Sequence, residues 1–149
     1  MLTSSQTYSL PAPQREEKRS VPMNANTTAP ANFGEFLQRK REEKQITLRK
    51  MAEQLGFSAP FLSDVEKDRR NPPELAKLEQ IAEILGLDDN DKQTMYNLAG
   101  KKRDSVAPDL PDYIMKRDYV AAALRTARDL DAGEEEWLQF VKELKERKG

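Results

Sequence analysis

Basic side chains in the first half of the chain have the charge and the N–H donors needed to bind phosphate groups. Between Phe36 and Pro73, nine basic residues outnumber six acidic ones. One basic run, Lys67-Asp68-Arg69-Arg70-Asn71, is expected in a polar loop. Because the whole chain has a formal net charge of -1, any attraction to nucleic acid must be local to this segment. The alternative is that these cations only solvate the surface of a helical bundle.

Carboxylates gather in the second half of the chain. From Asp104 to the C-terminus, eleven acidic residues outnumber eight basic ones. Asp129, Asp131 and the run Glu134-Glu135-Glu136 have the residue types of a metal-binding or catalytic cluster. Acidic residues also favour the first turn of a helix, where they interact with the positive end of its dipole. We adopt the second interpretation and predict no metal site.

The sequence contains neither cysteine nor histidine. Disulfides, zinc sites with nitrogen or sulfur ligands, and Ser-His-Asp or Cys-His catalysis are therefore excluded. An enzyme would have to work with carboxylates, Lys or Tyr, and no arrangement of these residues indicates an active site. We predict a protein that is not an enzyme and has no cofactor.

No apolar run approaches the roughly 18 residues that a membrane helix needs. The N-terminus lacks a basic start followed by an apolar core, so a secretory signal is not expected. The absence of cysteine is compatible with a reducing cytoplasm, and we expect a cytoplasmic protein.

Residues 1–31 are predicted to be a disordered tail. This segment holds four of the nine prolines, many Ser and Thr, and no apolar periodicity, so it cannot bury enough surface to offset its ordering entropy. Its charged cluster Arg15-Glu16-Glu17-Lys18-Arg19 is either a phosphate contact or a solvated linker, and the linker is the simpler interpretation. Met23 near the end of the tail is an alternative start of translation.

From Phe33 onward the pattern is helical. Leu occurs 16 times against nine Val and Ile together, and no stretch alternates with period two, so we predict an all-α fold. Five helices are expected in the first part of the chain. They run from Phe33 to about Lys44, from Thr47 to Leu55, from Ala59 to about Lys67, from about Leu75 to Leu85, and from about Asp89 to Ala99.

Local signals mark the ends of these helices. Thr47 and Ser58 are suited to N-cap positions, where a hydroxyl accepts a backbone N–H. Gly56 and Gly86 are suited to left-handed C-caps. The three residues between the second and third helices, Gly56-Phe57-Ser58, give the spacing of a helix-turn-helix, although short turns also join ordinary bundle helices.

A linker is predicted at residues 101–112, which include Pro108 and Pro111, and a helical hairpin at residues 113–149. Its first helix would run from about Tyr113 or Asp118 to Leu130, and its second from about Ala132 to Lys148. Asp131 and Glu134 have the spacing of a capping box. In the second helix Trp137, Phe140, Val141 and Leu144 form an apolar stripe at spacings of three and four.

The run TLRKMAEQLGFSAPFLSDVEKDRRNP, from Thr47 to Pro72, closely resembles the Cro/C1-type helix-turn-helix of phage repressors and the related XRE regulators. The resemblance extends over residues 32 to 99 and rests on several matching positions. These are Met51-Ala52, Leu55-Gly56, Ser58, Leu62-Ser63, Val65-Glu66, Pro72 and Ile84-Leu85-Gly86-Leu87. It implies a lambda repressor-like five-helix domain over residues 32–100 that binds operator DNA, usually as a dimer.

The resemblance also assigns residues. It places the third helix in the major groove and implies a largely buried structural ion pair between Arg41 and Glu66. Two positions depart from the family pattern, Leu48 where Gln often contacts phosphate, and Asp68 where Gly is common. The candidate DNA-binding residues are Thr47, Arg49, Ser58, Ala59, Pro60, Phe61, Ser63, Asp64, Lys67, Arg69, Arg70 and Asn71. Ala59 and Pro60 offer no hydrogen-bonding side chain, so base readout would use methyl contacts or Asp64 accepting from cytosine.

The sequence therefore predicts a sequence-specific DNA-binding transcriptional regulator, and we expect a repressor that acts as a homodimer on double-stranded DNA. In the dimer the apolar stripe would pair across a two-fold axis and set the recognition helices about 34 Å apart. Alternatively, the hairpin packs back on its own bundle through Leu110, Tyr113 and Ile114. A different function with the same fold is a protein-interaction adapter or antitoxin whose C-terminal helices bind a partner. An adapter would not need the basic loop Lys67-Asp68-Arg69-Arg70-Asn71.

Overall fold

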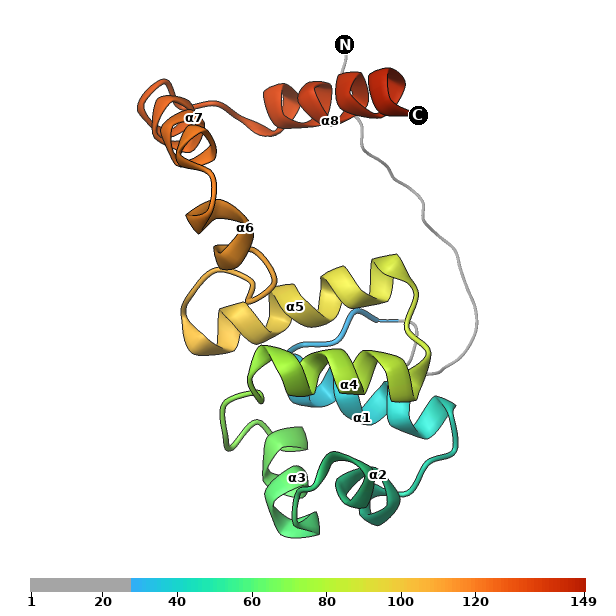
Figure 1. Ribbon diagram of the computed structural model, residues 1–149. Coiled ribbons are helices and arrows are strands. Elements are labelled where there is room, and N and C mark those ends of the chain that lie inside the picture. The colour runs from blue at the N-terminus through green and yellow to red at the C-terminus, as the bar shows by residue number, and fades with distance from the viewer. Residues whose placement is uncertain (1–27) are drawn as a thin grey trace.

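The computed structural model describes residues 28–149, and this part of the chain forms eight α-helices and no strand (Figure 1). The all-α class predicted from the sequence is confirmed for these residues. Residues 1–27 of the predicted tail, with the cluster at 15–19, lie outside the described residues. The helices are α1 Phe33–Glu43, α2 Leu48–Leu55, α3 Ala59–Glu66, α4 Leu75–Leu85, α5 Asp89–Arg103, α6 Pro111–Met115, α7 Asp118–Asp129 and α8 Glu134–Lys148.

The predicted caps of α2 and α3 are confirmed. Thr47 Oγ1 accepts a hydrogen bond from the N–H of Lys50 at 3.1 Å. Ser58 Oγ accepts one from the N–H of Phe61 at 3.2 Å. Gly56, with φ of 76°, ends α2 in the left-handed conformation that glycine adopts without steric cost. These caps fix a short turn between α2 and α3.

Helices α1 to α5, here called the bundle, share one hydrophobic core. Leu37, Met51, Leu62, Leu78 and Met95, one from each helix, each have an exposure of 0%. Side chains from all five helices therefore contribute to one buried interior, and α2 and α3 lie at the end of the bundle farthest from the C-terminal helices (Figure 1).

Gly34 lets α1 lie directly against the end of α3. A Cβ at this position would come within 2.4 Å of the carbonyl oxygen of Glu66. Because backbone atoms cannot yield as the tip of a side chain can, glycine is needed for this close approach.

The end of α5 differs from the expectation. The helix was expected to end at Ala99, with Gly100 after it, but it continues to Arg103, and Asp104 ends it with φ of 58°. Gly100 instead lies inside the helix, where its carbonyl accepts from the N–H of Ser105 at 2.9 Å. A Cβ on Gly100 would lie 2.9 Å from the backbone N of Ala107. The glycine therefore leaves room for the chain that follows the helix to pack against it.

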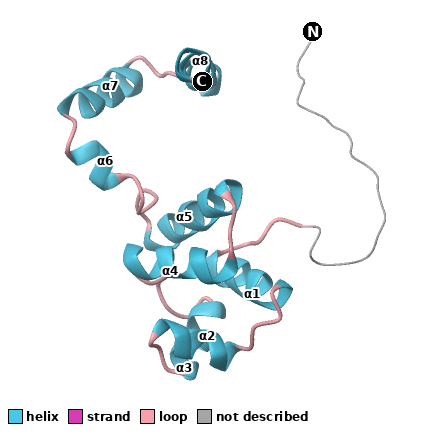
Figure 2. Ribbon diagram, turned by 45° about the vertical axis from the view of Figure 1, so that its right-hand side comes forward, coloured by secondary structure: helices cyan, strands magenta, loops and turns pink. Residues whose placement is uncertain are grey.

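Helices α6 to α8, here called the arm, extend away from the bundle (Figure 2). A break at Lys116 and Arg117 separates α6 from α7, where one helix from Tyr113 had been an option. Arg117 explains the break because its backbone is extended, its guanidinium donates to the carbonyl of Tyr113 at 3.1 Å, and it lies 4.0 Å from the centre of that ring. The two views show α7 and α8 running in different directions rather than side by side.

The capping box predicted at Asp131 and Glu134 is wrong by two residues. Asp131 has φ of 57° and ends α7, with its N–H donating to the carbonyl of Arg128 at 3.1 Å. The N-cap of α8 is Gly133, whose N–H donates to the Glu136 carboxylate at 2.8 Å. The tight left-handed turn after α7 uses Asp131, so the next helix starts later than Ala132.

Candidate nucleic-acid interface

Helix α3 presents one face to the core and the other to solvent. Leu62 and Val65 are buried, whereas Pro60 is exposed and Ser63 and Asp64 are half-buried. None of the twelve candidate DNA-binding residues is buried. They come from the start of α2, from α3 with its N-cap, and from the loop after α3, which the helix-turn-helix brings together at one end of the bundle.

Arg41 and Glu66 form an ion pair between α1 and the end of α3. Arg41 Nε lies 2.7 Å from Glu66 Oε2, and Arg41 Nη2 lies 3.0 Å from Oε1, so the guanidinium binds the carboxylate with two bonds. A third bond joins Arg41 Nη1 to the carbonyl of Ile46 at 2.8 Å. The hydrogen bond to Glu66 raises the pKa of Arg41, and both residues are at most 9% exposed. The pair is a structural element that holds α3 on α1.

Asp64 lies beside the basic loop. Its carboxylate oxygens are each 3.7 Å from a guanidinium nitrogen, one on Arg69 and one on Arg70. The two arginine side chains remain 67% and 55% exposed, so both can still reach a phosphate outside the protein. Asp64 thus aligns two cations at the end of α3.

The aromatic pair of Phe57 and Phe61 packs beside the basic loop. The rings of Phe57 and Phe61 are 4.9 Å apart, and the Arg70 guanidinium lies 5.1 Å from the Phe61 ring. Lys77 of α4 donates to the carbonyl of Leu55 at 2.7 Å and lies 5.5 Å from the Phe57 ring. These contacts fix the turn of the helix-turn-helix and one of its loop arginines.

Two residues that the sequence analysis did not single out contact the loop after α3. Lys102 and Arg103, at the end of α5, bind the carbonyl oxygens of Asp68 and Pro72. The only sequence signal is the run Lys101-Lys102-Arg103, and it does not indicate contacts 34 and 31 residues away. Asp68 has φ of 65°, which fits its place where the family commonly has Gly.

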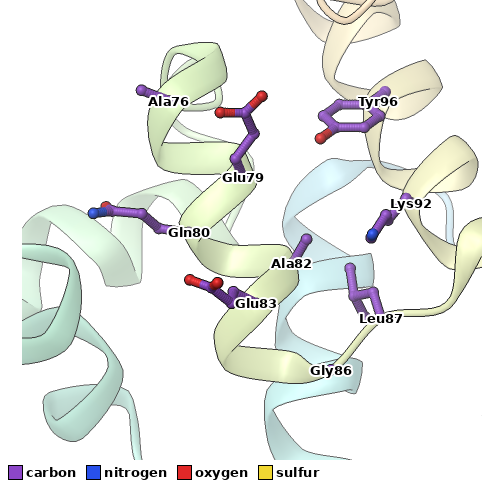
Figure 3. A pocket seen from close by; sticks show the side chains of 9 residues that line it. All are labelled: Ala76, Glu79, Gln80, Ala82, Glu83, Gly86, Leu87, Lys92 and Tyr96. Atoms are coloured by element: carbon purple, nitrogen blue, oxygen red, sulfur yellow. The ribbon is translucent and has the colours of Figure 1, made fainter.

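A separate pocket of about 730 Å³ lies between α4 and α5, and Figure 3 shows its lining. Glu79 and Glu83 come from α4, and Lys92 and Tyr96 from α5. Burial, together with the charges of Glu79 and Asp109, raises the pKa of Tyr96. Nowhere in residues 28–149 do three or more metal-ligating side chains gather at one point.

No helix in the described part of the chain is both long and apolar enough to span a membrane.

Residues 32–95 match a family described as a helix-turn-helix domain. The chain is 37% identical over 54 residues to the HTH-type transcriptional repressor RghR of Bacillus subtilis, a match that covers 36% of the chain and 40% of RghR. It is 33% identical over 82 residues to an uncharacterized HTH-type transcriptional regulator of Mycobacterium tuberculosis, covering 55% of the chain and 56% of that protein. The immunity repressor protein of Bacillus phage phi105 is 37% identical over 54 residues, covering 36% of the chain and 37% of the repressor.

The matched stretches thus span between 37% and 56% of these relatives. A solved complex of SinR protein and SinI protein is similar at a TM-score of 0.38 and 20% identity, over 78% of this chain and 97% of that chain. The residues matched by the family model, 32–95, contain α1 to α4 and the first part of α5. Residues 32–95 of this chain are therefore similar to helix-turn-helix domains, including those of HTH-type transcriptional regulators.

Proposed function

We propose that the chain is a sequence-specific DNA-binding transcriptional regulator that acts as a repressor. The observation that carries this proposal is the position of the basic loop beside the solvent-facing side of α3. The relatives named as repressors support the direction of regulation. The surface around α3 is where a Cro/C1-type domain would enter the major groove.

The residues around α3 divide into two classes of contact. Arg49, Lys67, Arg69 and Arg70 are exposed cations suited to phosphate, which sets affinity and register but does not read sequence. Base edges would face the start of α3, where Ala59 and Pro60 supply only apolar atoms and suit thymine methyl groups. We therefore expect strong phosphate binding and modest direct readout.

Selection from random duplex DNA would identify the preferred site, and titration of that site at several salt concentrations would measure affinity. Each phosphate contact lowers the slope of log K against log salt by about 0.9. Replacing both Arg69 and Arg70 by Ala should weaken binding to all sequences and make the slope less steep by about 0.9 for each of the two lost contacts. Arg125→Ala in the exposed part of α7 is the matched control. An unchanged affinity and slope in the double variant would contradict the assignment.

We propose further that the protein is a homodimer held by the apolar stripe of α8. Trp137, Phe140 and Val141 are 40%, 52% and 42% exposed, although burying side chains of this kind is worth roughly 1.5–3 kcal/mol each. Folding back onto the bundle does not cover the arm, because Leu110 and Tyr113 stay 45% and 52% exposed. A second copy offers the same stripe in return.

The charges beside the stripe favour an antiparallel pair of α8 helices. Helical geometry puts Glu134 and Lys145 on one flank of the stripe and Glu136 and Arg147 on the other. In an antiparallel two-fold pair each flank faces the same flank of the second copy, so each glutamate meets a cation. In a parallel pair opposite flanks meet, which sets Glu134 against Glu136 and Lys145 against Arg147.

The absence of native cysteine allows a direct test of this orientation. Single variants Glu134→Cys, Glu136→Cys and Lys145→Cys would be mixed in pairs and treated with a short thiol cross-linker. The antiparallel pair predicts a product from the 134 and 145 mixture. A product only from the 134 and 136 mixture would show a parallel pair. A full-length protein that sediments as a monomer at tens of micromolar would contradict the dimer itself.

The second candidate function is an adapter or antitoxin that binds a partner protein through the arm. The observation in its favour is apolar surface away from the α8 stripe, with Met115, Tyr119 and Leu130 at 77%, 71% and 77% exposure. Replacing Met115 and Leu130 by Ser separates the two proposals. DNA binding and sedimentation should stay unchanged in this variant, and only the capture of a partner protein should fail.

A further inference from the structure

Two cations at the end of α5 hold the loop that follows α3. Lys102 Nζ donates to the carbonyl oxygen of Asp68 at 3.1 Å, and it lies 3.2 Å from that residue's carboxylate. The Arg103 guanidinium donates to the carbonyl oxygen of Pro72 and lies 3.3 Å from the carboxylate of Glu74. Lys102 and Arg103, here called the clamp, thus bind the loop at both of its ends.

The segment between the two anchor points carries the residues proposed to contact DNA. Arg69, Arg70 and Asn71 are all exposed. The N–H of Arg69 donates to the carbonyl of Asp64 at 2.9 Å, which completes the turn after α3. Within the described residues no backbone–backbone hydrogen bond involves residues 70–73. The clamp therefore supplies the support that regular structure does not give to this part of the loop.

We infer that Lys102 and Arg103 are positioning residues, which hold the loop over residues 68–74 in its DNA-binding conformation without touching DNA. This inference rests on the proposed DNA-binding function. A loop that is fixed before binding loses less conformational entropy when it meets the phosphates. The clamp thus raises DNA affinity by keeping Arg69 and Arg70 in place.

The clamp also lies where the bundle joins the arm. Directly after Arg103, Asp104 adopts its left-handed conformation and the chain turns back onto Gly100. The DNA-facing loop and the first turn of the arm are therefore supported by the same end of α5. A truncation placed before Arg103 would remove half of the clamp together with the arm.

The first test compares three variants of the full chain with a duplex chosen by selection. Lys102→Met and Arg103→Met should each weaken binding by about 1.5-fold to fivefold, the range expected for exposed ion pairs. Lys101→Met is the matched control, because it removes the same charge from the same helical turn and its side chain is exposed. Equal losses in all three variants would overturn the inference, since bulk charge would explain them.

Asp68→Asn gives a test in which two explanations predict opposite signs. Removing a negative charge beside the basic loop should tighten DNA binding if electrostatic attraction alone matters. The clamp predicts weaker binding, because the contact at 3.2 Å to Lys102 is lost. Asparagine tolerates the φ of 65° at this position, so backbone strain does not confuse the result. Tighter binding would overturn the inference.

A cycle with the loop arginines separates positioning from direct phosphate contact. In a chain that already carries Arg69→Ala and Arg70→Ala, Lys102→Met should cost nothing further, because nothing remains to be positioned. A phosphate contact made by Lys102 itself would keep its full cost in that background and would lower the salt slope by about 0.9. That outcome would reassign Lys102 as a DNA contact.

A readout without DNA keeps the clamp testable if no duplex is bound and the proposed function fails. Trypsin cleaves after Arg69 and Arg70, so the rate of cleavage in this loop reports how firmly it is held. Lys102→Met and Arg103→Met should raise that rate, and Lys101→Met should not. Equal rates in all variants at unchanged melting temperature would overturn the clamp independently of DNA binding.

Discussion

In α4 of the bundle, apolar residues spaced three and four apart are buried, with Leu78 and Leu85 at 0% and 1% exposure. In α8 of the arm the same spacing leaves Trp137 and Phe140 at 40% and 52% exposure. Both helices follow one rule of amphipathic patterning. The pattern therefore specifies a helix and its apolar face, whereas burial of that face depends on whether another helix packs against it.

The two regions also use their charges differently. The bundle directs charged side chains toward other helices of the same chain, as in the pair of Arg41 and Glu66. The ion pairs within the arm join close neighbours in sequence, as in Lys116 with Asp112 and Arg128 with Asp129. Ion pairs between helices thus stabilise the bundle, whereas no ion pair among residues 28–149 joins the arm to the bundle.

The largest effect should come from breaking the long-range ion pair of the bundle. Arg41→Ala leaves the Glu66 carboxylate buried without its partner, and removing one member of such a pair typically costs about 3–5 kcal/mol. Urea unfolding followed by circular dichroism would measure the free energy of unfolding. A loss of DNA affinity at unchanged stability would instead identify Arg41 as a phosphate contact.

Replacing the same residue type in each region should sharpen the comparison. Leu55, at 1% exposure in the bundle, should cost about 2–5 kcal/mol when changed to Ala. Leu138, at 58% exposure in α8 and away from the stripe, should change stability by about 0.5 kcal/mol or less. Thermal unfolding of the two variants provides the measurement. Similar losses would mean that the arm folds as part of the bundle.

The features predicted correctly from the sequence are those that local chemistry decides. Thr47, Ser58 and Gly56 act within one turn of the helix ends that they cap, so their types and spacing were enough. Local signals failed where two of them competed. Asp131 could either end α7 or cap the start of α8. In the structure it adopts the left-handed turn that ends α7, and Gly133 is the N-cap of α8.

The features missed are those that depend on tertiary contacts. Gly100 looked like a helix end, but its carbonyl and its missing Cβ serve the chain at Ser105 and Ala107. Lys102 and Arg103 fell in the predicted linker at residues 101–112, whereas the structure places them in the last turn of α5. Their role depends on the path of the loop after α3, which one sequence without the fold does not provide. The prediction that one side of α3 faces outward, in contrast, came from the family resemblance and not from any local signal.

A substitution in the stripe should separate association from folding. Because Phe140 is about half exposed, Phe140→Ala should cost the dimer about 0.8–1.5 kcal/mol in each of its two copies, which is at least about tenfold in Kd. The bundle should melt at the wild-type temperature, because Phe140 contacts none of its core. Trp137 is the single tryptophan of the chain, so its emission during dilution reports the stripe directly. An unchanged dilution curve would remove Phe140 from the interface.

The smallest effect should be a dependence on pH at the start of the bundle. The N–H of Ala31 donates to Glu35 Oε1 at 2.8 Å, and this bond together with Arg39 lowers the pKa of Glu35 below its ordinary 4.5. A carboxyl group whose pKa is lower in the folded state stabilises the fold above its unfolded pKa and loses that contribution as pH falls through the folded value. Glu35→Gln should therefore lower the melting temperature slightly at pH 6, and the difference from wild type should shrink as the pH falls below about 4.

Glu146→Gln, in the exposed arm, is the matched control and should leave the bundle's melting temperature unchanged at pH 6 and below pH 4. A difference for Glu35→Gln that stays constant from pH 6 to pH 3 would show that the carboxylate acts through shape and not through charge.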